Sequence, residues 1–415
     1  MAARQALPST LLRLCVICAT SLQAMSPGTA PDHVMDTEVA QQDGEALAAQ
    51  IYHDLMALIH QVRKEVTALS LAMRPTAEAP PEAGPLEGLD DASVQSATQL
   101  LQSLASDVVP KLAFLANLAT KHQTVYRLTD AASQDSTLQM AKDLGAQVLL
   151  GEQARGPHVV SASVGTRFAR AVHQLAVALV EHVAELCQSF MDERTRTALL
   201  MAQKKRQGAH AQPVAMPPCT RATSLSLTKK LWTLCDAAQG EKTQMPSYIA
   251  RLPHNNWEAM CMVWRQNELL MRDGLAELQE ALEHESDEET IQAEDSNVIL
   301  EPSWDQSPVL SAEEKETGRH VHALLTQGLA VLPALGKALD KRTYDCDAGA
   351  DAVEAMTAAQ DDLIAAVLYE ADESTPLATA VQEYRAACQR VSDTVPGVGA
   401  GVLDGLEEAL HAFHL

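Results

Sequence analysis

The sequence predicts an all-α protein built from helical bundles. Three observations support this: apolar residues recur every three or four positions, aromatic residues make up only 3% of the chain, and no convincing stretch alternates apolar and polar residues as a strand does. Ala, Leu and Val supply most of the 47% hydrophobic content, a balance that favours helices over sheets. The chain of 415 residues is long enough for two or three compact domains.

The first 31 residues differ from the rest of the chain. They contain Arg4 and Arg13, several Ser and Thr, and no acidic residue, and we expect a variable or disordered segment here. A mitochondrial-type targeting segment is the alternative, because such segments are basic and poor in acids. Cys15 and Cys18 form a C-x-x-C pair, but no second pair completes a zinc site.

Residues 32–200 are predicted to form the first helical bundle. Two stripes of eight apolar side chains run from Leu47 to Met73 and from Val164 to Phe190, at steps of three or four. Such steps place each stripe on one face of a helix. Because single helices are only marginally stable in water, the stripes favour packing into a bundle. Pro110 lies inside a weaker helical pattern and predicts a kink or a fresh helix start.

Charged connectors separate the helices predicted beyond residue 200. Residues 201–222 form a basic, Pro-containing linker, and residues 285–312 form an acidic linker that we expect to be disordered. Between them, residues 223–284 are predicted to form a central helical pair. Residues 313–415 are predicted to supply the C-terminal helices that complete the bundle. The fold expected is thus two subdomains joined by charged linkers.

The charge balance bears on the partners that this chain can have. Its net charge of -24 comes from 31 Lys and Arg against 55 Asp and Glu, so nucleic acid and anionic membrane surfaces are not expected partners. No run of about 18 uninterrupted apolar residues is present, so we expect no transmembrane helix.

The sequence lacks the short motifs that accompany common catalytic and cofactor sites. It contains no G-x-x-x-x-G-K-[ST] loop, no H-E-x-x-H pair and no G-x-S-x-G elbow. His182 and Glu185 lie three apart on a predicted helix, but the second Glu-x-x-His copy of a carboxylate-bound metal bundle is missing. We therefore expect no catalytic residue, metal site or cofactor. An enzyme with an unrecognised carboxylate or cysteine site is the alternative.

The helix predicted after Pro253 is apolar nearly all round over two turns. One stripe includes Trp257 and Trp264 and is typical of a core face, although the two tryptophans are also candidates for partner contact. Met262, Leu269 and Leu270 lie on a flank of the same helix. Apolar residues on two sides imply burial on two sides, and we expect one side to face the bundle and the other a partner.

The same helix runs into an acidic stretch that contains Asp287, Glu288 and Glu289. Acids near a helix C-terminus are unfavourable by about 0.3–1 kcal/mol each, so their clustering indicates a use, most simply attraction of a basic partner surface. A solubilising spine or a flexible linker is the alternative. Ser286 precedes three acids and Ser307 precedes a proline, so both are candidate phosphorylation sites.

The stretch from 227 to 283 carries the most distinctive residues of the chain. Trp232 and Cys235 lie three apart, Leu252-Pro253 follows, then Asn255 or Asn256, and then Met271-Arg272-Asp273 leading to Glu277-Leu278. This pattern resembles the central region of the cyclin-D-binding protein family. Gly274 stands where that family favours Ala.

The resemblance implies an all-helical fold with bundles similar to those of vinculin-like proteins. It further implies a regulator without catalysis that binds D-type cyclins or helix-loop-helix transcription factors. Such a protein restrains cell-cycle progression from the nucleus and the cytoplasm. The alternative is a vinculin-like structural adaptor that links cytoskeletal or trafficking proteins.

Overall fold

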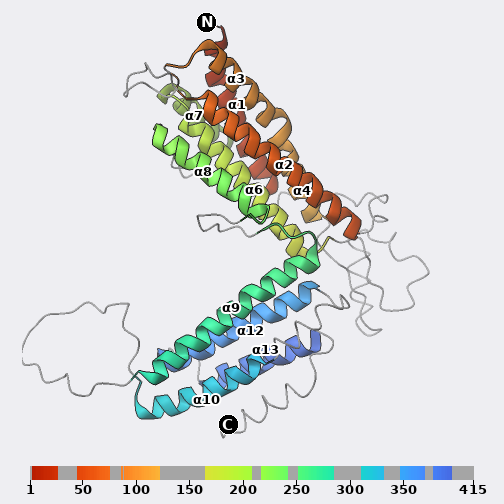
Figure 1. Cartoon of the computed structure of the whole chain (residues 1–415), viewed down its shortest axis with the longest axis vertical. Helices are drawn as coiled ribbons and strands as arrows, with labels where there is room; N and C mark the ends of the chain where they lie inside the picture. Colours follow the sequence, from red (N-terminus) through yellow and green to blue (C-terminus); the bar gives the residue numbers. More distant parts are fainter. Residues whose placement is uncertain are drawn as a thin grey trace, which may run out of the picture. The chain divides into compact units, whose positions relative to one another are not determined.

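The computed structural model describes ten ranges of the chain and confirms the predicted fold class (Figure 1). Of the described residues, 88% are helical and none lies in a strand. The chain divides into two compact units, Met1–Ala259 and Met260–Leu415, and each has its own hydrophobic core. The described ranges are 2–26, 44–74, 86, 88–121, 164–207, 216–241, 251–284, 310–330, 346–369 and 377–394.

The first unit is a bundle of helices packed around one core (Figure 1). Both predicted apolar stripes are confirmed, since all sixteen side chains are 6% exposed or less. The helices of this unit are α1 (Ala2–Met25), α2 (Gly44–Ala72), α3 (Asp91–Ser103), α4 (Val109–Lys121), α6 (Thr166–Ser189), α7 (Glu193–Gln207) and α8 (Arg221–Ala238). The two stripes lie on and around α2 and α6.

Helix α1 occupies most of the segment expected to be disordered at residues 1–31, so that expectation is wrong for residues 2–25. Its side chains at Leu7, Leu11, Leu14 and Cys18 are 2% exposed or less and lie in the core of the first unit. Steps of three and four residues place them on one stripe, which packs against α6. Burial of this stripe stabilises the helix although the composition is typical of an unstructured end.

Helix α1 is also long and apolar enough, over Ala6–Met25, to cross a membrane by length and composition alone. The rule of an uninterrupted apolar run overlooked this, because Arg13 divides the stretch. Here one face of the helix lies in the core of the bundle, which accounts for its apolar character. That the protein has no membrane partner stays a prediction.

A π-helical turn joins α3 to α4 at Leu104–Val108. Pro110 has no N–H to donate and its ring clashes with the carbonyl four residues before it, so the regular α-helical pattern cannot continue. The Val109 N–H donates to the Leu104 carbonyl five residues back, and the helix then resumes. The predicted kink at Pro110 thus takes the form of a π turn.

The predicted central helical pair is divided between the two units. Helix α8 belongs to the first unit, where Leu231, Leu234 and Cys235 are 2% exposed or less in the same core as α1. The basic linker expected at 201–222 is also shorter than predicted, because α7 continues to Gln207. Residues 208–215 lie outside the described residues.

The second unit contains α9 (Asn256–Glu283) from Met260 onward, with α10 (Ala312–Leu329), α12 (Cys346–Leu368) and α13 (Leu377–Thr394) (Figure 1). Its core includes Met271 and Leu278 of α9 together with Leu325, Met356 and Tyr384, all fully buried. Helices α10, α12 and α13, the described part of the range 313–415, therefore share a core with α9 that is separate from the core of the first unit.

The end of α9 is capped from another helix. The Lys315 ammonium of α10 donates to the His284 carbonyl at 2.6 Å, which supplies the basic group that the last turn of α9 lacks in its own sequence. Most of the expected acidic linker, 285–309, lies outside the described residues. Its last residue is already helical, since α10 begins at Ala312 after a capping box formed by Ser311 and Glu314.

Candidate functional site

Helix α9 presents a pair of leucines to solvent. Met271 and Leu278 are fully buried and fix the rotation of the helix in the second unit. Because successive helical residues are 100° apart, Leu269 lies on the side opposite Met271 and Leu270 lies between the two faces. Their side chains are 69% and 49% exposed. The flank that the sequence singled out is therefore partly open to a partner.

The other candidate docking residues on this helix lie in different surroundings. Met262 is half-buried and lies two turns before Leu269 on the same side of α9. Trp264 packs against the core of the second unit, and its buried indole Nε1 has no hydrogen-bond partner among the described residues. Trp257 is half-buried in the first turn of α9, within the first unit. The structure thus does not gather the two tryptophans with Leu269 and Leu270 on one surface.

Acidic groups gather where α9 meets α12. The hydroxyl of Tyr369, just after α12, donates to Glu277 Oε1 at 3.1 Å, and Tyr369 is itself 61% exposed. Burial raises the pKa of Asp361 on α12, and the nearby Asp362 and Glu277 carboxylates raise it further. Acidic side chains of both helices therefore lie close together where α9 meets α12, while Arg272 of α9 is ion-paired with Glu268.

Gly274 of α9 faces side chains of α12. A Cβ at this position would lie 3.1 Å from Ile364 Cδ1 and 3.6 Å from Gln360 Nε2. The Gln360 side chain also crosses between the helices, donating to the Met271 carbonyl at 2.6 Å. The three atoms nearest to such a Cβ all belong to side chains, so an alanine here would require only a small displacement of side-chain ends.

Five of the candidate site residues lie outside the described residues. They are the acids Asp287, Glu288 and Glu289 and the candidate phosphorylation sites Ser286 and Ser307. Their roles stay predictions from the sequence.

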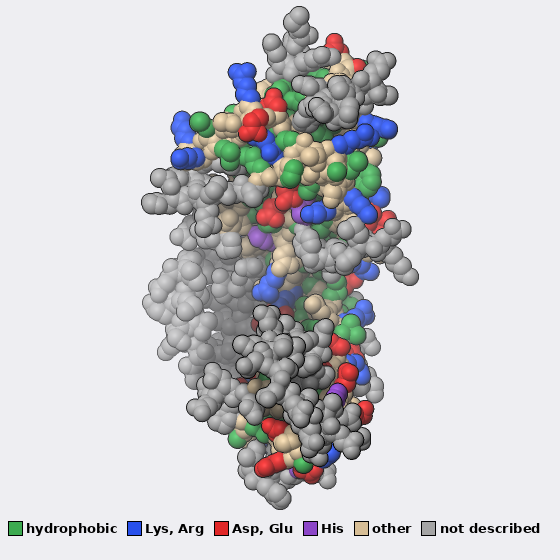
Figure 2. Space-filling model, turned by 90° about the vertical axis from the view of Figure 1, so that its left-hand side faces the viewer, with side chains coloured by type: hydrophobic (Ala, Val, Ile, Leu, Met, Phe, Trp, Pro, Cys, Tyr) green, Lys and Arg blue, Asp and Glu red, His purple; other side chains and the backbone are tan. Residues whose placement is uncertain are grey.

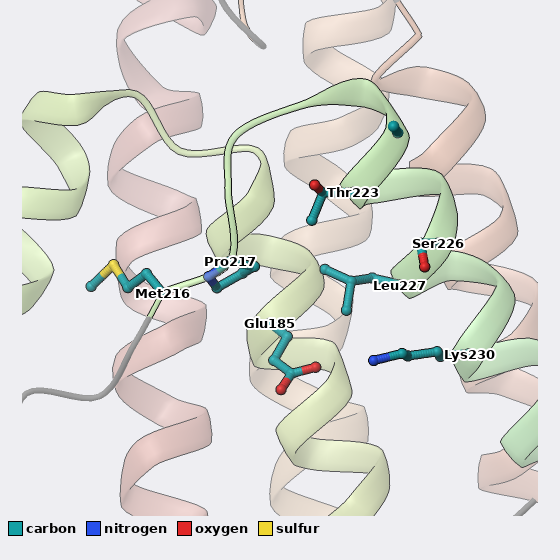
Figure 3. Close-up of a pocket in the computed structure, with 8 residues that line it drawn as sticks. Glu185, Met216, Pro217, Thr223, Ser226, Leu227 and Lys230 are labelled. Carbon is teal, nitrogen blue, oxygen red and sulfur yellow. The ribbon is translucent and has the colours of Figure 1, made fainter. Parts of the chain in front are cut away.

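The first unit carries an open depression of about 580 Å³ beside α8 (Figure 3). In Figure 3 the Glu185 carboxylate of α6 and the Lys230 amine of α8 point toward one another. His182 lies one turn before Glu185, and its Nδ1 is 3.1 Å from Glu185 Oε2. The lining residues are Glu185, Met216, Pro217, Ala222, Thr223, Ser226, Leu227 and Lys230.

The chemistry of this depression suits contact with a polar chain segment. Two hydroxyls, one carboxylate and one amine surround an apolar floor that includes Leu227, so donors and acceptors are present at its rim. Of this group, only His182 and Glu185 are visible as a spacing in the sequence. The rest was missed because α6 and α8 meet through the tertiary fold, which no local spacing records.

The thiols of the first unit lie mostly in its core. Cys15 and Cys18 of the C-x-x-C pair are 2% exposed or less, and burial raises the pKa of Cys18 well above its usual value. Within the described ranges, no three His, Cys, Asp or Glu side chains are placed so that they could hold a metal ion. For the whole chain, the expectation of no metal, cofactor or catalytic residue stays a prediction.

Comparisons with known proteins identified no relative of this chain. No protein-family model, no curated protein and no solved structure matches it. The resemblance to cyclin-D-binding proteins therefore rests on the residues of the sequence alone.

Proposed function

We propose that this protein is a non-enzymatic regulator that acts by binding other proteins, in the manner of the cyclin-D-binding proteins that it resembles. Its expected partner is a D-type cyclin or a helix-loop-helix protein, and its expected effect is to restrain cell-cycle progression in the nucleus and cytoplasm. The site proposed for the partner is the outer face of α9, around Leu269 and Leu270.

The exposure of these two leucines carries the proposal. A leucine that is 69% exposed next to one that is 49% exposed leaves a contiguous apolar area in water, at a cost of about 25 cal/mol per Å². Single exposed apolar side chains are common on protein surfaces, but neighbouring ones more often mark contact sites. The helix cannot rotate to hide them, because Met271 and Leu278 anchor its other face.

The charge around the leucines indicates what kind of partner would fit. Glu277 lies two turns after Leu270 on the same side of α9, and Asp361 and Asp362 of α12 lie near Glu277. A partner helix that is basic on one face and apolar on the other would satisfy both features. Its association would be steered by charge and would weaken as salt rises.

Direct binding between purified proteins tests the proposal. The full chain is immobilised and exposed to a purified D-type cyclin and, separately, to a purified helix-loop-helix domain, with binding followed by interferometry. The double variant Leu269→Ser/Leu270→Ser should weaken binding at least about tenfold, since central apolar contacts dominate most interfaces. Circular dichroism should show the variant folded, because both side chains are exposed.

Phe114→Ser is the matched control, since Phe114 is 63% exposed on α4 of the first unit. It should bind like the wild type. If the cyclin and the helix-loop-helix domain both fail to bind, the proposed partner class is wrong. If one binds but the leucine variant binds equally well, the α9 site is wrong.

A structural adaptor is the second candidate function, favoured by the first unit's packing of long helices. Helices α1, α2 and α6 have 24, 29 and 24 residues and share one core. Cosedimentation with actin filaments tests this candidate. Filament binding without binding to cyclin or helix-loop-helix proteins would favour the adaptor over the regulator.

A further inference from the structure

An exposed apolar strip lies along the seam between α2 and α8 in the first unit. Two contacts fix how these helices pair: Arg63 Nε lies 3.0 Å from Asp236 Oδ1, and the Trp232 indole donates to the Thr67 hydroxyl at 2.9 Å. Four residues forward on α2 thus correspond to four residues back on α8, so the helices run antiparallel.

The apolar members of the strip follow from this pairing. One turn beyond Thr67 on α2 lies Leu71, and two turns before Trp232 on the same side of α8 lies Leu225. Leu71, Leu225 and Trp232 are 66%, 54% and 37% exposed. The hydrogen bond to Thr67 holds the half-exposed indole in a fixed orientation. We call these three residues the seam strip.

Basic side chains flank the seam strip. The exposed charged residues on the paired parts of the two helices, 63–74 and 221–236, are all Lys or Arg: Arg63, Lys64, Arg74, Arg221, Lys229 and Lys230. Glu65 on this stretch is buried, and Asp236 is ion-paired with Arg63. Figure 2 shows, on the side of the first unit where α7 and α8 lie, hydrophobic side chains next to Lys and Arg side chains, with Asp and Glu side chains among them.

This local charge is opposite in sign to that of the chain as a whole, which has a net charge of -24. Among these cations, Arg63 is paired with Asp236 and Lys230 points toward Glu185, which leaves Lys64, Arg74, Arg221 and Lys229 as the other exposed cations on these stretches. Leu225 and Trp232 are seven residues apart, which is about 10.5 Å along a helix and matches the spacing of apolar residues at i and i+7 on a partner helix.

We propose that the seam strip docks an acidic amphipathic helix of a partner protein. The apolar face of that helix would cover Leu71, Leu225 and Trp232, and its carboxylates would face Lys64, Arg74 and Lys229. This site lies in the first unit and carries basic side chains, so it would serve a second partner whatever binds at Leu269 and Leu270.

A designed peptide of about 14 residues, or four helical turns, is the probe. It carries Leu at i, i+3, i+4 and i+7 with Glu elsewhere and a fluorescent label, and its anisotropy is followed as the full-length protein is added. A scrambled peptide of the same composition, a Lys version and poly-glutamate are compared with it. The Leu-Glu helix should bind tightest, with an affinity that falls as NaCl is raised from about 50 to 500 mM.

Variants assign the binding to the seam strip. Leu71→Ser/Leu225→Ser and Lys64→Glu/Lys229→Glu should each weaken peptide binding about tenfold or more. The exposed Phe114→Ser of α4 and Lys204→Glu/Lys205→Glu of α7 should not. Thermal melting checks that all four proteins are folded.

Three results would overturn the proposal. The first is binding of poly-glutamate or of the Lys peptide that equals binding of the Leu-Glu helix. Equal binding of poly-glutamate would make the surface a general polyanion site, and equal binding of the Lys peptide would mean that the surface is no site for an acidic helix. The second is no binding of the Leu-Glu helix at low salt, or binding that the seam variants leave unchanged. The third is sedimentation showing a dimer that the seam variants dissociate, which would make a second copy of this chain the occupant.

Discussion

The ring of Tyr384 on α13 fills the space that a side chain at Gly328 on α10 would need. Tyr384 is fully buried, and a Cβ built on Gly328 would overlap its hydroxyl and the adjoining ring carbons. Gly328 is therefore required by the close approach of two helices and not by its own backbone conformation, which is helical.

Gly328→Ala should destabilise the second unit by about 1–3 kcal/mol, because the overlap forces a fully buried ring to move. This runs against helix propensity, which favours alanine over glycine by about 1 kcal/mol. Urea unfolding followed by circular dichroism measures the change. Gly274→Ala is the control, since the three atoms nearest to its Cβ are side-chain atoms of Ile364, Gln360 and Asp361, the closest at 3.1 Å.

Removing the hydroxyl of Tyr384 should partly rescue the alanine variant. The double variant Gly328→Ala/Tyr384→Phe should be more stable than Gly328→Ala alone, since the Cβ then has one fewer atom to displace. Equal stability of the two would show that the packing at this point is not the cause.

Two adjacent asparagines cap two different helices. Asn255 Oδ1 accepts from the Glu258 N–H at the start of α9, as a local N-cap does. Asn256 Oδ1 instead accepts at 3.0 Å from the Phe168 N–H in the first turn of α6. The residue at the N-cap of α6 is Gly165, which has a φ of 86° and no side chain to offer. Asn256 supplies the missing acceptor from a distant part of the chain.

Asn256→Ala should cost about 1 kcal/mol of unfolding free energy, the usual value for loss of an N-cap side chain. Asn256→Asp should retain most of that stability, because the carboxylate also accepts and is favoured at a helix N-terminus. Thermal or urea unfolding of the three proteins makes the comparison. Unchanged stability of the alanine variant would mean that water replaces this cap without loss.

The sequence predicted the helices from their apolar stripes because burial of one face is a local pattern. The stripes from Leu47 to Met73 and from Val164 to Phe190 needed no knowledge of the partner helix to be recognised. The role of Asn256 could not be predicted in this way, since its partner Phe168 lies 88 residues away. The Lys315 cap on His284 was hidden for the same reason, across 31 residues.

The assignment of helices to units was equally beyond local reasoning. Helices α8 and α9 are neighbours in the chain and both amphipathic, so the sequence favoured a pair. Which core receives each apolar face depends on the whole set of helices. In the candidate site, Leu269 and Leu270 were named because an all-round apolar helix is visible in the sequence. Leu71 and Leu225 were not predicted as contact residues, since a single exposed leucine has no local signature in the sequence.

The eight cysteines should differ widely in their reactivity toward iodoacetamide at pH 8. Six are buried, and burial raises the pKa of Cys235 to about 12, which leaves about one thiolate in ten thousand at that pH. Cys219 and Cys346 are half-buried, and burial also raises the pKa of Cys219. We expect Cys346 to be labelled first and Cys219 second, as read by mass spectrometry of peptides.

Labelling in concentrated urea is the control, where all eight thiols should react at similar rates. Early labelling of Cys15 or Cys18 in the folded protein would contradict the packing of α1. It would mean that this helix leaves the core of the first unit often enough to expose its buried face.

Asp107, in the π turn between α3 and α4, should make the first unit less stable in acid. The Lys111 ammonium at 2.6 Å and the Gln61 amide at 3.3 Å both donate to its carboxylate, and they lower its pKa in that order. A carboxyl group whose pKa is lowered by folding stabilises the protein at pH values above its unfolded pKa of about 3.9. That contribution is lost as the pH falls through the lower folded value.

The comparison with Asp107→Asn isolates this effect, since asparagine is neutral at every pH. The wild type should exceed the variant in unfolding free energy by a constant, small amount between pH 7 and pH 5. Exposed ion pairs of this kind contribute about 0.2–1 kcal/mol. The difference should shrink below about pH 4, where the unfolded chain takes up the proton first. In a Lys111→Met background the same comparison should depend less on pH, because the main cause of the lowered pKa is gone. A difference that widens toward pH 3 would mean that folding raises this pKa, and that Lys111 and Gln61 do not hold the charged form of Asp107.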